Sequence, residues 1–530
     1  MKMKFKGIIL LTTATAFAVS SGYADQPVMP LNVVLIIADD LGVGDVGCYH
    51  MTASGAPREP SRTRQRGLTR ERDARGGSRM IRTPNIDRLA TQGMRATDAH
   101  SISAVCTPSR YSMLAGRYYH RYPRNWNGEA LIEADRPTIA SVFRSAGYAT
   151  GYFGKVHTGW GEPSEDRKHR QDIDWNSELP RGVLEMGFDK YFGTPFTHNE
   201  PPFVFVEDRH VVGLDPADPL VVVPKEIERG NWGWGLSKGA KAAHAARPED
   251  EIDLIVMGKA IDFIKETAGE KPFFINLAFV APHVPISPSK QFKGTTKLGR
   301  YGDFVEQLDW CVGQVLQTLE TEGLADNTLV IFTSDNGAIH HRHEYGMGHR
   351  ANLDWLGQKT DAWEGGVRVP FIVRWPGRVP EGKTFDQLVS LMDIPQTVWA
   401  AAGLTPPAGA APDSLNQLDV FTGKTTNAVR SELYMLGITG QALRSGDWVY
   451  IPQRGSCGVT TDPAMTWAMQ LGALGQINSD YDDEGKLKPG APQEQLYNMR
   501  DDPRQSTNVV LQYPEKAAEL AKRFKEVSKR

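Results

Sequence analysis

The chain has 530 residues, of which 40% are hydrophobic and 23% are charged, and its formal net charge is −3. These fractions are typical of globular proteins and exclude a disordered or fibrous chain. The near balance of charge argues against a nucleic-acid partner, because such binding requires a strongly basic domain. The length suits a large α/β domain with a smaller second one.

The first 24 residues have the pattern of an export signal. Three lysines within the first six residues precede an apolar stretch, residues 7–19, that is too short to cross a bilayer. Gly22 and Ala24 are small residues at the spacing of a cleavage site, so we expect cleavage after Ala24. The mature protein is then periplasmic or secreted and free of the membrane. An anchor that stays attached is the alternative.

Four apolar segments, rich in β-branched and aromatic residues, predict strands that are buried on both faces of a parallel sheet. They are residues 31–38, 148–153, 273–280 and 328–334. Helical patterns at residues 138–146 and 303–320 lie between them. This alternation predicts a doubly wound α/β sheet, in which ligands bind at the carboxyl ends of the strands.

Two regions interrupt this alternation. Residues 52–80 are rich in Arg, Gly and Ser and predict a mobile basic surface insertion, with a basic lid that attracts polyanions as the alternative. Beyond Gly423, a strand-forming segment at 442–451 and an amphipathic helix at 515–529 predict a smaller α+β domain. The expected division is a signal peptide, a large domain and a C-terminal α+β subdomain, at residues 1–24, 25–424 and 425–530.

The strongest local signal is the segment CTPSRYSMLAGR at residues 106–117. Pro108 suits the first turn of a helix and Gly116 suits its C-cap. Such a helix directs its positive N-terminal end at Cys106 and carries Arg110 one turn further on, which makes an anion site. From these residues alone, a buried structural cysteine is an equally good interpretation.

This segment and seven others, in the same order, resemble the type I, formylglycine-dependent sulfatases of the alkaline phosphatase superfamily. The resemblance covers residues 31–508 and implies a large mixed α/β sheet with helices on both faces, plus a smaller C-terminal α+β subdomain. It points to a bacterial glycan sulfatase. The other motifs are IIADDLGVGDVGCY, TPNIDRLATQGM, GKVHTG, APHVP, SDNG, KTDAWEGGVRVP and LYNMRDDPRQSTN.

The resemblance implies that a maturation enzyme oxidises Cys106 to formylglycine. The hydrated aldehyde supplies a hydroxyl that attacks sulfur and a second hydroxyl through which sulfate is released. Arg110 would steady the resulting negative charge. Cys48, Cys311 and Cys457 then allow at most one disulfide, whose pairing the sequence leaves open.

Two polar pairs follow predicted strands. Asp39 and Asp40 follow residues 31–38, and Asp335 and Asn336 follow residues 328–334. An all-oxygen set suits Ca²⁺ or Mg²⁺ better than zinc. Either pair alone is more often a turn, but the resemblance implies a metal at these four positions, usually calcium. That metal would bind a sulfate oxygen and favour the ionised nucleophile.

Four further polar residues lie in the family's motifs. By resemblance, Lys155 contacts sulfate and His157 takes the proton that triggers release of sulfate. His283 and Lys359 would hold the sulfate group and supply the proton of the leaving alcohol. Val156 stands where the family usually has an aromatic residue. Without the resemblance, His283 between its prolines is an ordinary structural histidine.

The predicted function is hydrolysis of a sulfate monoester, on a sulfated sugar or polysaccharide, with release of inorganic sulfate. Segments such as AVCTPSRY and YGDFVEQLDW resemble enzymes for galactose or N-acetylgalactosamine 6-sulfate. The alternatives are a phosphonate or phosphate monoester hydrolase and a non-catalytic sulfated-glycan-binding protein. Residues 339–349 carry four histidines, which is compatible with a transition-metal site; we interpret them as a loop at the pocket mouth.

Overall fold

The computed structural model describes residues 30–50, 80–122, 129–162, 173–223 and 236–529. The predicted signal peptide, and the predicted basic insertion except for Met80, lie outside these residues and stay predictions. Among the described helices, none combines the length and the apolar character that a membrane span requires.

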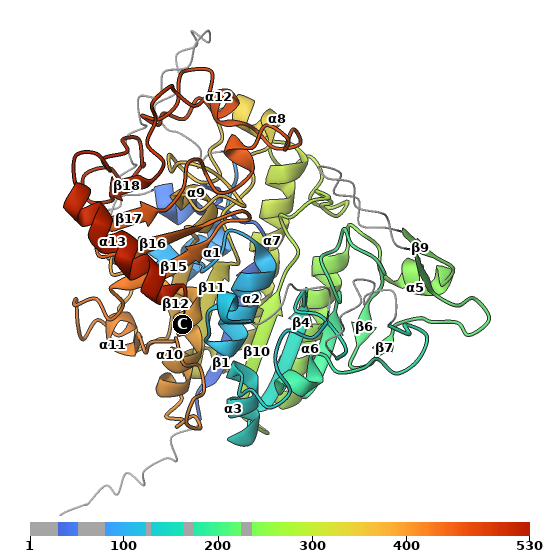
Figure 1. Ribbon diagram of the computed structural model, residues 1–530. Helices are drawn as coiled ribbons and strands as arrows, with labels where there is room; N and C mark the ends of the chain where they lie inside the picture. Colours follow the sequence, from blue (N-terminus) through green and yellow to red (C-terminus); the bar gives the residue numbers. More distant parts are fainter. Residues whose placement is uncertain (1–29, 51–79, 123–128, 163–172, 224–235, 530) are drawn as a thin grey trace, which may run out of the picture.

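A ten-stranded mixed sheet forms the centre of the molecule (Figure 1). Strand β1 pairs in parallel with both β10 and β11, and β4 and β5 extend the parallel part, while β12 runs antiparallel to β11. All four predicted strands are present, and the α/β prediction is confirmed. From one edge to the other, the strands are β13 (Lys383–Phe385), β2 (Met94–Ala96), β12 (Phe371–Arg374), β11 (Thr328–Ser334), β1 (Asn32–Ala38), β10 (Phe273–Ala278), β4 (Ala149–Gly154), β5 (Lys190–Gly193), β6 (Val206–Glu207) and β7 (His210–Val211).

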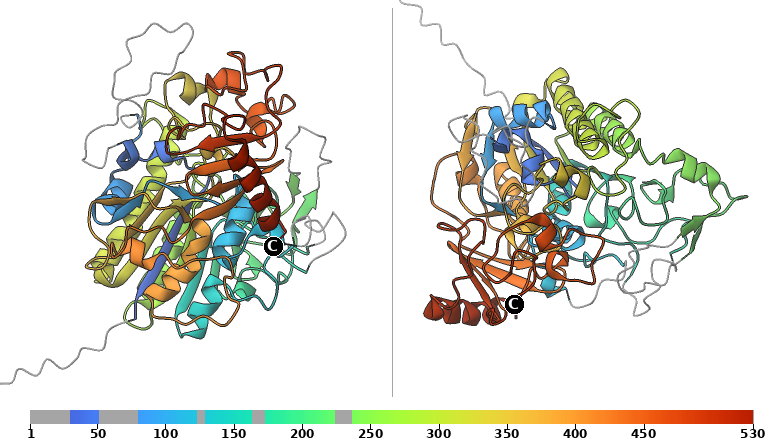
Figure 2. Two further views of the ribbon diagram at one scale, coloured as in Figure 1. Left: turned by 60° about the vertical axis from the view of Figure 1, so that its left-hand side comes forward. Right: turned by 90° about the horizontal axis from the view of Figure 1, so that it is seen from above.

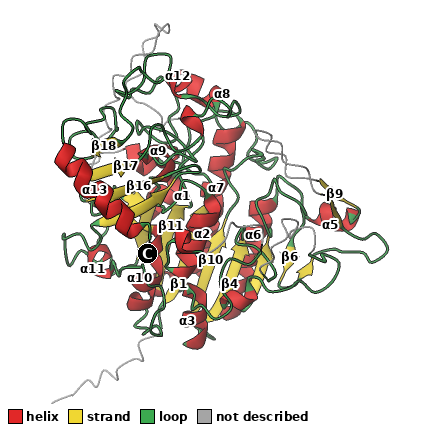
Figure 3. Ribbon diagram, viewed as in Figure 1, coloured by secondary structure: helices red, strands yellow, loops and turns green. Residues whose placement is uncertain are grey.

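Alternate residues of β1 belong to two different hydrophobic cores. Val33 and Leu35 pack into one core, and Val34 and Ile36 into the other. Both faces of the sheet are therefore covered, as Figure 3 shows, and this explains the continuous apolar sequence of β1. The first core contains α2 (Cys106–Ala115), α3 (Ile139–Ser145) and α10 (Ile394–Ala401), and the second contains α1 (Pro84–Thr91), α6 (Ile252–Thr267) and α7 (Arg300–Thr321).

The helix predicted at 138–146 is α3, and its first residue is set by a cap. The Thr138 hydroxyl accepts a hydrogen bond from the Ser141 N–H, and the Ser141 hydroxyl accepts one from the Thr138 N–H. The helix predicted at 303–320 is α7, which begins three residues earlier, at Arg300. The shorter elements are α5 (Lys241–Ala246), α8 (Arg342–Gly346), α9 (Glu364–Val367), α11 (Leu418–Phe421) and α12 (Leu471–Leu474), with the strand pairs β3 (Ala99–His100) and β14 (Val389–Ser390), and β8 (Val221–Val223) and β9 (Leu236–Lys238).

A second, four-stranded antiparallel sheet lies in the C-terminal part. Its strands are β15 (Glu432–Leu436), β16 (Gln441–Ser445), β17 (Trp448–Ile451) and β18 (Gln495–Asn498). The terminal helix α13 (Pro514–Val527) covers it by packing Leu520 on Leu443 and Tyr450. Figures 1 and 2 show this sheet and the segment around α5 at different ends of the molecule. The strands at 442–451 and the terminal helix are thus confirmed; the boundary at residue 425 stays a prediction.

A buried ion pair connects the segment before β15 to Asp393, which directly precedes α10. Arg430 donates from Nε to Asp393 Oδ2 at 2.9 Å and from Nη2 to the Asp413 carbonyl oxygen at 2.8 Å. Only 5% of the Arg430 side chain and 1% of the Asp393 side chain are exposed. Asp393 also accepts from the Leu415 N–H at 2.9 Å, so the pair fixes the chain on both sides of the connection.

We expect Arg430→Met to lower the free energy of unfolding by about 3–5 kcal/mol, because it leaves the Asp393 charge buried without a partner. Chemical denaturation would measure the loss. Arg500→Met is the matched control, since the Arg500–Asp447 pair is exposed and should contribute little. Equal effects of the two substitutions would contradict this account.

Candidate active site

The two polar pairs meet at the carboxyl ends of β1 and β11. These strands are in register, with Ala38 opposite Ser334, so Asp39 and Asp335 leave the sheet side by side. The Asp40 N–H donates to Asp335 Oδ1 at 3.2 Å, and Asn336 Nδ2 donates to Asp40 Oδ1 at 2.8 Å. The four oxygen-bearing residues that the sequence singled out therefore lie together at the carboxyl ends of these central strands, where ligands usually bind in such sheets.

The backbone of Asp40 has φ 62°, in the left-handed region. Residues other than glycine seldom adopt it, and the strain costs about 1–3 kcal/mol. The rest of the structure maintains this conformation. Such strain is concentrated at functional sites.

Each of the three carboxylates has a cationic partner, and all six side chains are largely or fully buried. The chain positions these cations from three separate segments: α2, the loop after β4 and the loop before α9. The pairs are Lys155 Nζ with Asp39 Oδ2 at 2.6 Å, Lys359 Nζ with Asp40 Oδ2 at 2.7 Å, and Arg110 Nε with Asp335 Oδ2 at 2.9 Å.

Burial and charge act in opposite directions on these carboxyl groups. Burial raises the pKa of Asp39, but the neighbouring Lys155 and other cations outweigh it and hold the pKa well below its usual range. The pKa of Asp40 is lowered in the same way, chiefly by Lys359. Burial and the negative charge of Asp39 instead raise the pKa of Asp335 to about 6. Three carboxylates this close favour an additional cation.

Two oxygen atoms of the cluster are suited to such a cation. Asp39 Oδ1 and Asn336 Oδ1 are buried and have no hydrogen-bond donor among the described residues. A buried acceptor without a donor requires an explanation, and both belong to the hard oxygen ligands that Ca²⁺ and Mg²⁺ prefer. The donor set therefore fits a divalent cation.

Cys106 is the first residue of α2, so the helix predicted beyond it includes this cysteine, and Gly116 is the C-cap, as predicted, with φ 56°. The Sγ atom of Cys106 lies within 4.8 Å of carboxylate oxygens of Asp39 and Asp335, and 3.1 Å from His157 Nδ1. Burial raises the pKa of the Cys106 thiol, so the unmodified side chain is a poor nucleophile.

The loop after β4 carries Lys155 and His157 into the site together. Lys155 extends to Asp39, whereas His157, with φ 54°, faces Cys106. Beyond the imidazole lies Glu200, whose Oε2 is 3.7 Å from His157 Nε2.

His283 follows β10, and its Nε2 lies 3.7 Å from Asp40 Oδ2. Nδ1 donates to the Val284 carbonyl oxygen at 2.6 Å, because a carbonyl oxygen can only accept. Burial and the positive charge of Lys359 lower the pKa of His283 to about 3. The structure thus brings all ten residues of the predicted site together.

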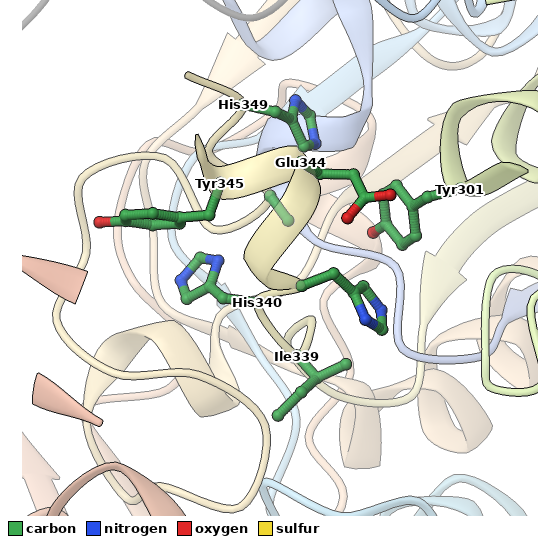
Figure 4. Close-up of a pocket in the computed structure, with 8 residues that line it drawn as sticks. Tyr301, Ile339, His340, Glu344, Tyr345 and His349 are labelled. Carbon is green, nitrogen blue, oxygen red and sulfur yellow. The ribbon is translucent and has the colours of Figure 1, made fainter. Parts of the chain in front are cut away.

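The histidine-rich segment 339–349 is structured rather than a simple loop, because it contains α8 (Figure 4). His349 Nε2 lies 2.6 Å from Asp45 Oδ1, and the Tyr301 hydroxyl donates to Asp45 Oδ2 at 2.8 Å. His349 and Tyr301, with His340 and Tyr345, line a cavity of about 10 Å³, roughly the space of one water. Among the described residues, the groups that could hold a metal include no histidine of this segment.

Three site residues have no counterpart in the sequence predictions: Asp45, Tyr301 and Glu200. Asp45 fixes the loop that follows Asp40, since it also accepts from the Gly42 N–H at 2.8 Å. Its place in the turn-rich segment after Asp40 is the one signal that would have marked it. Glu200 lies in a segment without a motif, and nothing local distinguishes it from a surface glutamate.

Comparisons with known proteins agree with this geometry. Residues 31–404 match the family model described as sulfatase. An N-acetylgalactosamine-6-O-sulfatase of Bacteroides thetaiotaomicron is 32% identical over 94% of this chain and 93% of its own length. The human N-acetylgalactosamine-6-sulfatase is 33% identical over 73% of this chain and 65% of its own length. The chain belongs to the sulfatase family, whose members are sulfuric ester hydrolases.

Solved structures show the same fold. A Bacteroides thetaiotaomicron structure, described with the metabolism of multiple glycosaminoglycans, is 32% identical, covers 95% of this chain and 100% of its own, and has a TM-score of 0.77. A phosphonate monoester hydrolase of Agrobacterium radiobacter covers 94% of this chain and 95% of its own, with 17% identity and a TM-score of 0.56. The second likeness shows the fold alone.

All four cysteines are buried and free, and burial raises the pKa of each thiol. We expect iodoacetamide to label them in the folded, unmodified protein at least about tenfold more slowly than after denaturation, because the thiolate is the reactive form. Mass spectrometry of the labelled peptides would measure this. Rapid labelling of Cys106 in the folded protein would contradict the assignment of a protonated, buried thiol.

Proposed function

We propose that this sulfatase removes sulfate from a sulfated sugar or polysaccharide, through a formylglycine at position 106. The observation that carries the proposal is the position of Cys106 at the start of α2, beside both the carboxylate cluster and His157. The two relatives named above act, by their names, on N-acetylgalactosamine 6-sulfate. Galactose or N-acetylgalactosamine 6-sulfate is accordingly the proposed substrate group.

When Cys106 is oxidised, the hydrated aldehyde provides one hydroxyl that attacks sulfur and another whose proton loss expels sulfate. Arg110 and Lys155, charged and buried, hold the negative charge at this position. His157 accepts the proton at Nδ1, the atom that faces residue 106. A maturation enzyme must carry out the oxidation.

Lys359 and His283 lie on the Asp40 side of the site. Asp40 and the other carboxylates raise the pKa of Lys359 although burial opposes them, so its ammonium stays charged at neutral pH. Lys359 can therefore bind a sulfate oxygen and protonate the leaving alcohol. His283 is held with Nδ1 as a donor to Val284, which leaves Nε2 toward the carboxylates and the incoming group.

Ca²⁺ is the proposed metal, with Mg²⁺ as the alternative, and Asp39, Asp40, Asp335 and Asn336 would hold it. The buried acceptors without donors, Asp39 Oδ1 and Asn336 Oδ1, support this set. Bound there, the cation supplies a Lewis acid for a sulfate oxygen.

Export and domain division complete the proposal. We infer that residues 1–24 are removed on export, that the protein works in the periplasm or outside the cell, and that residues 425–530 form a subdomain. In this setting the enzyme would degrade sulfated polysaccharides.

The substrate proposal is tested with the matured enzyme and a panel of sulfated mono- and oligosaccharides. We expect release of inorganic sulfate from 6-sulfated galactose or N-acetylgalactosamine, and at least about 10³-fold slower release by Cys106→Ala, because the nucleophile is lost. Matched phosphate and phosphonate esters are assayed in parallel. Preferential turnover of the phosphorus esters, or activity on aryl sulfates alone, would contradict the proposal.

The state of residue 106 is measured separately. We expect mass spectrometry of the peptide covering residues 101–117 to show formylglycine in active protein from the native host. An intact thiol at Cys106 in active protein would refute the nucleophile. A binding protein without catalysis would retain this thiol and release no sulfate.

The metal proposal predicts a thermal effect that is independent of turnover. Removal of divalent cations should lower the Tm, and Ca²⁺ should restore it. At a Ca²⁺ concentration 1,000 times the Kd, the free energy of unfolding should rise by about 4 kcal/mol. Asp335→Asn should weaken this response. Asp326→Asn, at the opposite end of β11 and exposed, is the control and should retain it. A wild-type Tm that changes neither on addition of chelator nor on addition of Ca²⁺ would contradict the proposal.

A further inference from the structure

Glu200 is a buried carboxylate next to the imidazole that faces the nucleophile. Its side chain is 1% exposed, and its Oε2 lies 3.7 Å from His157 Nε2. The other ring nitrogen, Nδ1, lies 3.1 Å from Cys106 Sγ. Residue 106, His157 and Glu200 therefore form a row in which the imidazole separates a nucleophile from a carboxylate.

Main-chain hydrogen bonds fix the two loops that carry this row. The Val156 N–H donates to the Thr194 carbonyl oxygen at 3.1 Å, and the His157 N–H donates to that of Pro195 at 3.3 Å. A turn closed by the Glu200 N–H and the Thr197 carbonyl oxygen, at 2.9 Å, then places Glu200. The contact between His157 and Glu200 is thus built by the backbone of the loops after β4 and β5.

The order of the row determines which nitrogen of His157 carries the proton. To accept a proton from residue 106, Nδ1 must be unprotonated, so the neutral ring must carry its hydrogen on Nε2. A carboxylate beside Nε2 favours this tautomer and stabilises the imidazolium that forms when Nδ1 is protonated. The resting separation of 3.7 Å is longer than a hydrogen bond, as is common before substrate is bound.

We propose that Glu200 is a positioning residue that sets the tautomer of His157 and stabilises its protonated form during release of sulfate; this inference rests on the proposed function. In that step His157 Nδ1 takes the proton of the free hydroxyl on residue 106. The electron pair left on that oxygen forms the carbonyl bond, and the carbon–oxygen bond to the sulfate group breaks. Inorganic sulfate leaves, water adds to the aldehyde, and the imidazolium returns its proton to solvent.

The role predicts a specific kinetic pattern for Glu200→Gln. Because release of sulfate is slowed and attack is not, kcat should fall by about 10²-fold or more. KM should fall with it, so that kcat/KM changes by less than about threefold. Rapid quenching should trap a sulfate adduct on the peptide of residues 101–117, which mass spectrometry detects. Glu200→Asp, which retains the carboxylate, should recover part of kcat.

Asp309→Asn is the matched control, since Asp309 is also a buried carboxylate but binds the N-terminus of α1. Its formylglycine content, kcat and KM should equal those of the wild type. An unchanged kcat in Glu200→Gln would overturn the role of Glu200. A raised KM without adduct would also overturn it, because a misfolded loop gives that pattern.

Stability and maturation are measured for every variant. If Glu200→Gln unfolds, the role of Glu200 is tested with Glu200→Asp alone. The shorter side chain moves the carboxylate away from His157, so this variant should still show a lower kcat and KM together and accumulate the sulfate adduct. Equal kinetics of Glu200→Asp and wild type, with the Gln variant unfolded, would assign Glu200 to folding and overturn the inference. Matured wild-type enzyme that releases no sulfate from any ester would overturn the proposed function itself.

Discussion

The compensation of three buried carboxylates by three buried cations is the constraint on which the site depends. Asp39, Asp40 and Asp335 lie at the carboxyl ends of β1 and β11, and a buried charge without a partner costs several kcal/mol. The compensating groups come from α2, from the loop after β4 and from the loop before α9. The ion pairs that offset the cost of burying the three carboxylates therefore also hold three distant segments in place. Stability and the geometry of the site depend on the same contacts.

The order of strands explains why these segments converge. β1 is central and has β10 on one side and β11 on the other, although β10 and β11 come much later in the chain. At such a point the loops that follow neighbouring strands diverge and leave a crevice, which is the usual ligand site of an open α/β sheet. Asp39 and Asp40 follow β1, Asp335 and Asn336 follow β11, and His283 follows β10. The strand order alone thus brings the ends of all three strands together.

The central strands could be predicted from the sequence because burial on both faces requires an unbroken apolar run. Residues 328–334 coincide with β11; the predictions for β1 and β10 differ by one or two residues at one end, and that for β4 by one residue at each end. The short strands β2, β6, β7 and β13 have no such run, since pairing rather than composition defines them. Pairs such as Asp39–Asp40 are common in turns, so metal ligation by these residues could be predicted only through the family resemblance. Asp45 lies in one of the family's motifs, but its contact with His349, 304 residues away, could not be predicted from that motif.

The balance of charge also bears on which step the site favours. With its carboxylates ionised, the cluster of three acids and three cations is neutral in sum, and a divalent cation would make it positive. A positive site attracts a sulfate ester, which carries one negative charge, and stabilises the additional negative charge that develops as the ester bond breaks. Free sulfate carries two negative charges and would bind most strongly of all. Before free sulfate can leave, the covalent bond between residue 106 and the sulfate group must break, and in the proposed mechanism the proton transfer from residue 106 to His157, with Glu200 behind it, drives that cleavage.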